Sequence, residues 1–409
     1  MSDRRSAVVV GSGALGTATA WHLMRRGLDV ALVDRGDLVS QTSPRAAGMA
    51  LQIQADDILS PIARLGIKRL VNFEADTGQP LQVHQTGSLK VARSESDERQ
   101  LHREVQRGTA MGVEVHEISA HEAGELAPWF TPGDALACWY APHDLYLEPG
   151  DLPRAYVAAL REGGAELRPH TEVTKVLIRD GAVDGVETNA GRIPAGNVVL
   201  AAGAWNNVLA ARLGVMLPLW PVRHELCITV PHASITNAQP AVRIMDAKAY
   251  ARPCDGGLMF GAYERQPLAV DIGERGEEFT IADLPIDEAP LREKAATVAD
   301  ELPLLGTLQW AQVRGGLPTM TPDGHFVVDR LRVAEGLWTI GGCNVGGLST
   351  SPALAGHLAE WMATGRRPEA IAPFGADRFG DRYTDAGALR RACMATYSDK
   401  YADEEVIAR

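Results

Sequence analysis

AVVVGSGALGTATAWHLMRRGLDVALVD, residues 7–34, is the stretch that decides the fold. The apolar run at residues 7–10 predicts a buried strand, and the G-x-G-x-x-G turn that follows it opens a segment with helical periodicity. Gly11 permits the sharp turn, Gly13 lets the backbone approach a pyrophosphate, and Gly16 lets the helix pack closely on the strand. N–H groups at the start of that helix attract phosphate charge. The stretch therefore predicts a dinucleotide-binding unit.

Asp34 closes the second strand of this unit and narrows the choice of dinucleotide. It lies close to the offset of about 20 residues at which an acidic side chain accepts hydrogen bonds from a ribose hydroxyl. A phosphorylated ribose would be repelled there, which disfavours NADP. The turn recognises what NAD and FAD share, so both remain open from this motif alone.

Length and composition exclude several classes of protein. The chain has 409 residues, 45% of them hydrophobic, with a formal net charge of −12. No apolar run approaches the about 20 residues of a membrane span, and no signal-type segment precedes the first strand. We therefore expect two or three domains, no nucleic-acid partner, no membrane span and a cytoplasmic location. Five cysteines without C-x-x-C spacing predict buried thiols, with neither a disulfide framework nor a metal site: Cys138, Cys227, Cys254, Cys343 and Cys393.

Patterns along the rest of the chain predict an α/β protein whose cofactor domain is discontinuous. A helical pattern spans about residues 57–77, and NVVLAAG at 197–203 has the character of an internal parallel strand. Segments before residue 312 alternate as in an antiparallel sheet, and residues 336–368 have the order strand, glycine-rich turn, helix. The sequence thus predicts a Rossmann-like domain built from both chain ends plus an α+β substrate domain with a mainly antiparallel sheet. The expected ranges are 1–80, 151–217 and 313–370 for the Rossmann-like domain, 81–150 and 218–312 for the substrate domain, and 371–409 for a C-terminal extension.

Seven motifs occur in an order that resembles one family. They are GSGALG with Asp34, TSPRAAGM, TGSLKVA, VLAAGAW, PVRHEL, RGGLPTMTPDGHFVVD and GCNVGGLSTSPALAG. Over residues 5–370 the chain resembles the D-amino-acid oxidase and sarcosine oxidase superfamily of FAD-dependent oxidoreductases, and it is most similar to the dimethylglycine and sarcosine dehydrogenase branch. The resemblance implies a Rossmann-like FAD-binding domain. Those enzymes often carry a folate-binding half, which the about forty residues after the last motif are too few to supply.

The resemblance also implies which residues hold FAD. The segment at 43–48 is expected beneath the flavin, Val173 beside the adenine, and N–H groups at the start of the last helix near the flavin C2 carbonyl. A helix dipole would there stabilise the negative charge of the reduced flavin. Relatives attach FAD covalently through a His or a Cys at places where this chain has Arg45 and Gly316, so we expect non-covalent FAD. The implied cofactor-binding residues are Gly11, Gly13, Ala14, Leu15, Gly16, Asp34, Arg35, Ser43, Arg45, Ala46, Ala47, Gly48, Val173, Ala202, Gly203, Trp205, Gly342, Gly346, Gly347, Leu348 and Ser349.

Four residues are candidates for the chemistry. His224 resembles the histidine that faces the flavin in the dimethylglycine branch, and Tyr250 resembles its tyrosine partner; together they can orient an amine and relay its proton. Arg252 and, second, Arg314 are candidate anchors for a substrate carboxylate, because arginine binds carboxylates in a bidentate manner. Structural roles in a strand or an ion pair are the alternatives for all four.

Two lysines that sarcosine oxidases use are replaced in this chain. Leu348 stands where a lysine binds the substrate carboxylate, and Met259 stands where a lysine assists the reaction with oxygen. The resemblance therefore leaves both the carboxylate anchor and the electron acceptor open, with oxygen and an electron-transfer partner equally admissible.

The leading hypothesis is FAD-dependent oxidation of the C–N bond of a small amine or amino acid. Hydride transfer to flavin N5 from a secondary, N-methylated or D-amino acid, of the sarcosine, dimethylglycine, iminodiacetate or proline type, would give an imine that water hydrolyses. One alternative is a flavoprotein subunit of a hetero-oligomeric amino-acid dehydrogenase, and another is a non-catalytic or RNA-modifying FAD-binding protein. The charged C-terminal tail could cap a domain or pair subunits, so a homo-oligomer stays open.

Overall fold

A six-stranded sheet forms the centre of the first domain in the computed structural model, which describes residues 6–400. Its strand order is β20-β21-β12-β1-β2-β8, and neighbours are parallel except β20 and β21. The strands come from three distant stretches of the chain because β12 and β21 extend the sheet beside β1. Their bounds are β1 (Ser6–Val10), β2 (Asp29–Val33), β8 (Glu166–Arg168), β12 (Asn197–Leu200), β20 (Val327–Arg330) and β21 (Leu337–Gly341).

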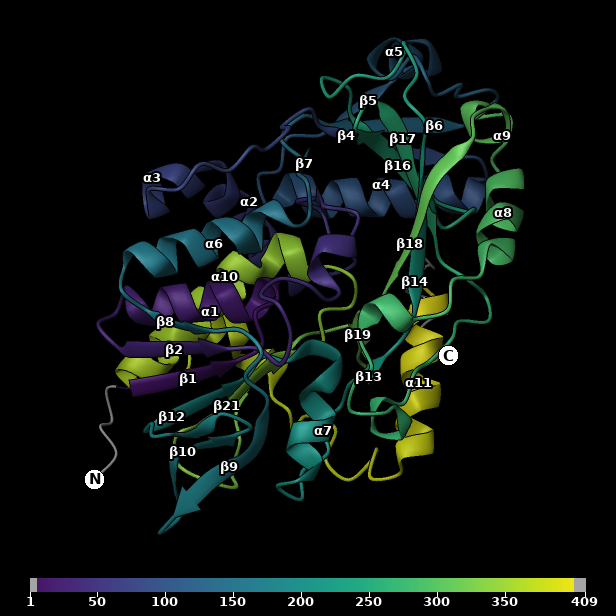
Figure 1. Ribbon diagram of the computed structural model, residues 1–409. Coiled ribbons are helices and arrows are strands. Elements are labelled where there is room, and N and C mark those ends of the chain that lie inside the picture. Colours follow the sequence, from purple (N-terminus) through teal and green to yellow (C-terminus); the bar gives the residue numbers. More distant parts are fainter. Residues whose placement is uncertain (1–5, 401–409) are drawn as a thin grey trace.

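Helices cover one face of this sheet and a small sheet lies at the other (Figure 1). Helix α1 packs against α10 and α6, and α10 packs against α2. The strands of the small sheet follow the order β11-β10-β9, with β10 next to β12. The bounds are α1 (Ala14–Met24), α2 (Leu59–Val71), α3 (Phe73–Thr77), α6 (Asp151–Glu162), α10 (Gly347–Thr364), β9 (Val173–Arg179), β10 (Ala182–Thr188) and β11 (Gly191–Ile193).

The second domain is built on an eight-stranded sheet with the order β18-β14-β17-β16-β15-β4-β6-β5. Every neighbouring pair is antiparallel except β15 and β4. The bounds are β4 (Ser88–Ala92), β5 (His116–Ile118), β6 (Ala137–Ala141), β14 (His224–Thr229), β15 (Ala241–Ile244), β16 (Ala249–Cys254), β17 (Gly257–Ala262), β18 (Trp310–Gly316), α4 (Glu95–Ala110), α5 (Ala120–Leu126), α8 (Glu288–Ala296) and α9 (Leu304–Thr307).

Short elements lie where the two sheets approach each other. Strand β3 pairs with β7, β13 pairs with β19, and α7 follows β12. Helix α11 lies in the C-terminal extension and packs on β13 and β19 (Figure 1). Their bounds are β3 (Met49–Ala50), β7 (Leu145–Tyr146), β13 (Trp220–Pro221), β19 (Thr319–Met320), α7 (Asn206–Ala211) and α11 (Ala386–Ser398).

The predicted fold class is confirmed, with local differences. The single helix expected at 57–77 is two helices, because the chain leaves helical geometry at Asn72 (φ −95°, ψ 13°). Strand β18 runs to Gly316 within the substrate sheet, so it crosses the expected boundary at residue 312. Of the expected extension at 371–409, residues 401–409 lie outside the described residues.

The remaining expectations from composition concern cysteines and membranes. All five cysteines are free; four are buried, and Cys343 is half-buried. Between residues 6 and 400, no helix combines the length and the apolar character needed to cross a bilayer. Within the same range, no group of three or more His, Cys, Asp or Glu side chains is placed to hold a metal ion.

Candidate active site

A large cavity, with an empty volume of about 2200 Å³ that includes its solvent-open part, joins the two domains. One end is lined by the turn after β1, by Asp34 and by Val173. The other end is lined by side chains of the eight-stranded sheet, among them His224 and Tyr250. The cavity therefore has a dinucleotide-like end and an end that carries titratable and aromatic groups.

At Gly11 and Gly16 in the turn after β1, the Cβ atom of any other residue would collide with neighbouring backbone atoms. Gly11 has φ 105°, and a Cβ atom there would lie 2.6 Å from the Ala201 carbonyl oxygen. A Cβ atom on Gly16 would lie 1.8 Å from the Gly11 carbonyl oxygen, so this glycine allows the helix to pack on the turn and does not itself line the cavity. Helix α1 begins after Gly13 and presents its N-terminus to the cavity. An N-terminus so placed is suited to a phosphate group.

Asp34 lies at the end of β2 and lines the same part of the cavity. Its Oδ2 accepts hydrogen bonds from the Ser12 N–H (2.8 Å) and the Ser12 hydroxyl (2.6 Å), and its Oδ1 accepts one from the Gly36 N–H (3.0 Å). Two carboxylate oxygens offer about four acceptor positions. The carboxylate is thus fixed in orientation and retains capacity for a ribose hydroxyl.

The segment between β2 and β3 crosses the middle of the cavity. The Ala14 N–H donates to the Ser43 hydroxyl (3.0 Å), which ties this segment to the start of α1. Arg45 donates to the carbonyls of Ser40 and Gln41, and burial lowers the pKa of its guanidinium. A Cβ atom on Gly48 (φ 75°) would lie 2.0 Å from the Leu147 carbonyl oxygen. Gly48 therefore lets this segment pack closely on the chain at Leu147 while the segment lines the cavity.

The turn before α10 is held in an unusual conformation. Asn344 (φ 44°) and Val345 (φ 64°) both adopt left-handed geometry and both line the cavity. Such geometry is costly for a β-branched residue, about 1–3 kcal/mol. Asn344 is 3% exposed, and its side chain accepts from the Thr321 N–H (2.9 Å) and donates to the Gly342 carbonyl (2.7 Å). These hydrogen bonds fix the turn, so the strained backbone conformation of Asn344 and Val345 is maintained.

The expectation that the Gly342 N–H faces the cofactor is not supported by this geometry. Gly342 does not line the cavity, and its N–H donates to the Thr319 hydroxyl (3.1 Å). The next residues, Gly346 to Ser349, do line it. Because the first N–H groups of a helix have no partner within the helix, the start of α10 retains donors for an anion or a carbonyl.

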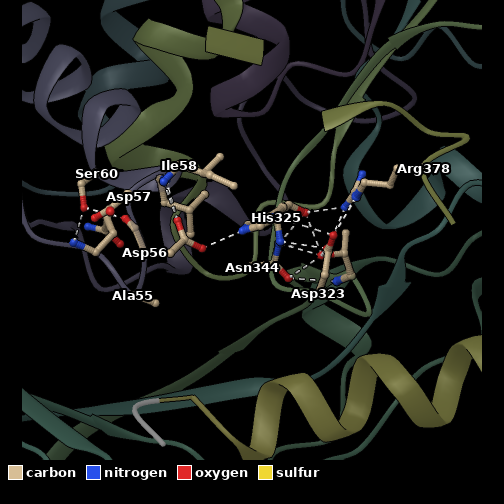
Figure 2. A network of polar contacts seen from close by, with 12 residues as sticks. Ala55, Asp56, Asp57, Ile58, Ser60, Asp323, His325, Asn344 and Arg378 are labelled. Carbon is tan, nitrogen blue, oxygen red and sulfur yellow. Dashed lines mark hydrogen bonds and ion pairs between the residues drawn. The ribbon is translucent and has the colours of Figure 1, made fainter. Parts of the chain in front are cut away.

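A charged network supports this turn from outside the cavity (Figure 2). His325 Nε2 lies 2.6 Å from Asp56 Oδ2, and His325 Nδ1 lies 3.5 Å from Asp323 Oδ2. Arg378 of the C-terminal extension binds Asp323 (2.7 Å), and the Asn344 amide donates to the His325 carbonyl (3.1 Å). Hydrogen bonds to the two carboxylates raise the pKa of His325 to about 9, so it is protonated at neutral pH. The network joins four separate stretches of the chain, at residues 56, 323–325, 344 and 378.

At the substrate end, His224 is hydrogen-bonded on both ring nitrogens. His224 Nε2 lies 2.8 Å from the Tyr250 hydroxyl, and Nδ1 lies 2.7 Å from the Tyr397 hydroxyl. The ring also lies 5.0 Å from that of Tyr263, centre to centre. Burial lowers the pKa of His224 to about 4, so the imidazole is neutral at physiological pH. His224, Tyr250 and Tyr263 all line the cavity.

Neither arginine predicted as a carboxylate anchor lines the cavity. Arg252 is 0% exposed, and its guanidinium donates to the Ala47 carbonyl (2.6 Å), the Pro253 carbonyl (2.6 Å) and Glu148 Oε1 (3.1 Å). Arg314 donates to the Ala46 carbonyl (3.1 Å) and, like Arg252, supports the cavity wall from behind. Buried arginine is a preferred ion-pair partner, and here that structural alternative describes the geometry.

Among the described residues, three other cations line the cavity and were not predicted: Arg212, Arg243 and Lys400. Arg243 on β15 is 7% exposed and is directly paired with Tyr250 on β16. Lys400 enters from the C-terminal extension, and burial together with the charge of Arg243 lowers its pKa to about 8. Nothing in the local sequence around either residue distinguishes it from a surface cation. Arg243 is placed in the cavity by the register of β15 against β16, and Lys400 by a contact between distant parts of the chain, and neither can be inferred from the local sequence.

Charge in the cavity opposes that of the whole chain. The lining contains five basic residues, Arg35, Arg45, Arg212, Arg243 and Lys400, and two acidic ones, Asp34 and Glu172. A positive cavity in a protein of net charge −12 favours an anionic occupant. Most residues expected to hold the cofactor line it: Gly11, Gly13, Ala14, Leu15, Asp34, Arg35, Ser43, Arg45, Ala46, Ala47, Gly48, Val173, Ala202, Gly203, Trp205, Gly346, Gly347, Leu348 and Ser349.

These features fit an FAD molecule. Two helix N-termini, a glycine cradle that a Cβ atom would fill, and a carboxylate at the end of β2 occur along one cavity that reaches the substrate sheet. A nicotinamide dinucleotide would use the N-terminus of α1, the glycine turn and the carboxylate in the same way. The second helix N-terminus at the turn before α10 matches what a reduced flavin requires, because it places positive potential where negative charge develops.

Comparison with known proteins gives an independent assignment. The family model described as FAD dependent oxidoreductase (DAO) matches residues 6–361. The chain is 27% identical to the mitochondrial pyruvate dehydrogenase phosphatase regulatory subunit of Mus musculus, over 95% of this chain and 44% of that protein. It is 27% identical to the mitochondrial dimethylglycine dehydrogenase of Mus musculus, over 94% of this chain and 46% of that protein. The chain thus spans less than half the length of these relatives.

A solved structure shows the same fold. The crystal structure of L-proline dehydrogenase from P. horikoshii superposes with a TM-score of 0.83 and 23% sequence identity, over 93% of this chain and 98% of that one. At this level of identity the likeness concerns the fold, including the position of both domains.

Proposed function

Because this chain belongs to the family of FAD-dependent oxidoreductases, as its motifs led us to expect, we propose that it oxidises the C–N bond of a small secondary or N-methylated amino acid. The observation that carries the proposal is the His224–Tyr250 pair, which lies in the same cavity as the two glycine-rich turns. Dimethylglycine dehydrogenase and L-proline dehydrogenase are named for substrates of this kind. FAD, when bound, accepts a hydride from the carbon next to nitrogen, and the resulting imine is hydrolysed by water.

The residues of the cavity favour a neutral amine, which the reaction needs because the nitrogen lone pair assists the departure of hydride. His224 is a weak base here, since burial lowers its pKa to about 4. Lys400 shows how the cavity treats an ammonium group: its pKa is lowered to about 8 by burial and by Arg243. A substrate ammonium in the same place would meet the same two effects and lose its proton more easily. The substrate ammonium therefore loses its proton because the cavity lowers its pKa, and a strong base in the protein is not required.

We propose that Arg243 and Lys400 bind the substrate carboxylate, in place of Arg252 and Arg314. Both line the cavity: Arg243 pairs with Tyr250, and Lys400 lies near enough to Arg243 for the two charges to interact, so together they supply two positive charges there. Arginine can bind a carboxylate with two parallel hydrogen bonds. This assignment accounts for substrate binding although Leu348 occupies the place where related oxidases have a lysine.

Anaerobic reduction of the purified yellow protein tests the proposal. Each carboxylated amine is paired with its carboxylate-free analogue: sarcosine with dimethylamine, dimethylglycine with trimethylamine, proline with pyrrolidine, alongside iminodiacetate and D-amino acids. We expect loss of flavin absorbance with at least one carboxylated member and not with its analogue. If no amine reduces a flavin that dithionite does reduce, the proposal is wrong. Comparing reoxidation by air with reoxidation by an artificial acceptor then identifies an oxidase or a dehydrogenase.

A second candidate is a non-catalytic FAD-binding role. It is favoured by the match to a regulatory subunit along 95% of this chain. In that case FAD would bind and would remain oxidised with every amine in the panel. The two candidates therefore predict opposite results in one experiment.

A further inference from the structure

The C-terminal extension returns to the substrate end of the cavity. Helix α11 lies along β13 and β19 and next to β14, the strand that begins at His224 (Figure 1). It is fixed there by the Cys393 thiol, 3.2 Å from the Met320 carbonyl, and by the Thr396 hydroxyl, which donates to the Pro322 carbonyl (2.9 Å). The last turn of α11 therefore has a defined place beside the site.

Tyr397, in that last turn, reaches the histidine of the site. The side chain is 0% exposed, and its hydroxyl lies 2.7 Å from His224 Nδ1. The ring packs edge-on against Tyr263, 5.2 Å away between ring centres. Burial raises the pKa of Tyr397 well above its usual value. Tyr397 therefore keeps its proton at all physiological pH values.

The position of the other protons follows from these contacts. Tyr397 is fully buried, and within the described residues its hydroxyl has His224 Nδ1 as its hydrogen-bond partner. Because a buried phenol proton needs an acceptor, Tyr397 donates to Nδ1. A neutral imidazole carries one proton, and with Nδ1 bare that proton is on Nε2. Nε2 faces the Tyr250 hydroxyl at 2.8 Å and donates to its oxygen. The bonds run in one direction, from Tyr397 through His224 to Tyr250.

We propose that Tyr397 is a positioning residue for amine oxidation: it fixes His224 as the Nε2–H tautomer, so that His224 orients Tyr250 and cannot take a proton from it. The role in catalysis rests on the proposed function, whereas the tautomer does not. An imidazole with a proton already on Nε2 has no lone pair there to act as a base. Tyr250 is therefore held as a phenol by its neighbour, and the substrate end of the cavity stays uncharged at this point.

The tautomer can be measured directly in the FAD-bound protein without substrate. Nitrogen-15 NMR of protein labelled at the histidine rings separates protonated from bare ring nitrogens, and the His224→Gln variant identifies the signals of His224. We expect a protonated Nε2 and a bare Nδ1 in the wild type. A protonated Nδ1 would overturn the proposal without recourse to any variant at position 397.

The Tyr397→Phe variant removes only the hydroxyl and keeps the ring that packs on Tyr263. We expect the Nε2–H signal to be joined or replaced by an Nδ1–H signal, and the rate constant of flavin reduction to fall about five- to tenfold, as for the loss of one hydrogen bond. We also expect a new ionisation in the pH profile of that rate constant, because His224 can then act as a base. Unchanged nitrogen signals in Tyr397→Phe would show that Tyr397 only fills space.

Tyr383→Phe is the matched control. Tyr383 belongs to the same extension and packs edge-on against Phe379, 5.3 Å away. It takes no part in the bonds of the His224 ring, whose nitrogens face Tyr397 and Tyr250. Its loss should change neither the His224 signals nor the pH profile. A protein that shows the expected tautomer but reduces no flavin with any amine would refute the proposed function and leave the assignment of Tyr397 standing.

Discussion

Protonated His325 should make the stability of this protein depend on pH between about 6.5 and 9. The imidazole is held between Asp56 and Asp323, which raise its pKa to about 9 from a usual 6.5. Below pH 6.5 the group is protonated in both the folded and the unfolded chain, and its contribution to stability is fully present. As pH rises from 6.5 to 9, only the folded chain keeps the proton, so stability falls. Above pH 9 the contribution is lost.

The size of the effect follows from the shift. One pKa unit corresponds to about 1.4 kcal/mol, so the raised pKa is worth at most about 3 kcal/mol, lost at about 1.4 kcal/mol per pH unit. The entropy of unfolding is about 2 cal/mol/K per residue, which for 409 residues gives about 0.9 kcal/mol/K. Each kcal/mol therefore moves the melting temperature by about 1 °C. The whole window should lower Tm by about 2 to 4 °C.

Thermal melts of the FAD-bound wild type and of His325→Gln, followed by far-ultraviolet circular dichroism, measure this effect. Two other groups titrate nearby: Glu264, whose pKa is raised to about 7 by burial, and Lys400, whose pKa is lowered to about 8. Both are present in both proteins, so the difference in Tm isolates His325. That difference should be largest at pH 6.5 and shrink towards pH 9. His121→Gln, which removes an 84% exposed side chain, is the control. A Tm difference that stays constant over this range would refute the reasoning.

Three further predictions concern the cavity. Gly13→Val should abolish FAD retention in a folded protein, because even a Cβ atom there would lie 3.1 Å from the Ser43 hydroxyl; the flavin-to-protein absorbance ratio measures it. Lys400→Met should raise KM for a carboxylated amine about tenfold with little change in kcat, as expected when a binding contact common to ground and transition states is lost. Arg252→Met should destabilise the fold by about 1–3 kcal/mol, seen in urea melts, because the carbonyls of Ala47 and Pro253 lose a buried donor. Glu148 is 38% exposed and adds little to this loss. A folded variant with only a raised KM would restore Arg252 as an anchor.

The sequence was most informative where the residues of a binding site lie next to one another in the chain. The roles of Gly11, Gly13 and Gly16 depend on backbone geometry within six residues, so the motif alone specified both the turn and its cavity. The turn before α10 was equally visible as a glycine-rich segment after a strand. Gly342 is the exception there: it does not line the cavity, and its N–H donates to the Thr319 hydroxyl.

Arginine roles could not be assigned from the sequence in this way. Arg243 and Arg252 both lie on strands of the same sheet. Arg243 pairs directly with Tyr250, and Arg252 follows Tyr250 by two residues on the same strand, so strand alternation places all three side chains on one face of the sheet. The two arginines therefore differ in their position along the strands: Arg252 donates to the carbonyls of Ala47 and Pro253, whereas Arg243 lines the cavity. The sequence contained the residues but not the strand pairing.

Tyr397 and Lys400 illustrate a second limit of local reasoning. Each contacts the site across more than 140 positions of sequence, and no motif surrounds either of them. From the sequence alone, the C-terminal extension is expected to cap a domain or to pair subunits, because its helical pattern contains no catalytic or binding motif. Its chemistry appears only once the fold brings α11 to β14.

The strained turn explains why a charged network away from the substrate should influence the cofactor. Asn344 and Val345 hold left-handed geometry that costs about 1–3 kcal/mol each, so the turn would relax if its supports were removed. One of these supports is the bond from the Asn344 amide to the carbonyl of His325, whose ring is fixed by Asp56 and Asp323. Deprotonating His325 leaves one ring nitrogen facing a carboxylate without a proton to share, which loosens that support. The start of α10 should then lose its alignment, and release of FAD should precede global unfolding at high pH more than at low pH.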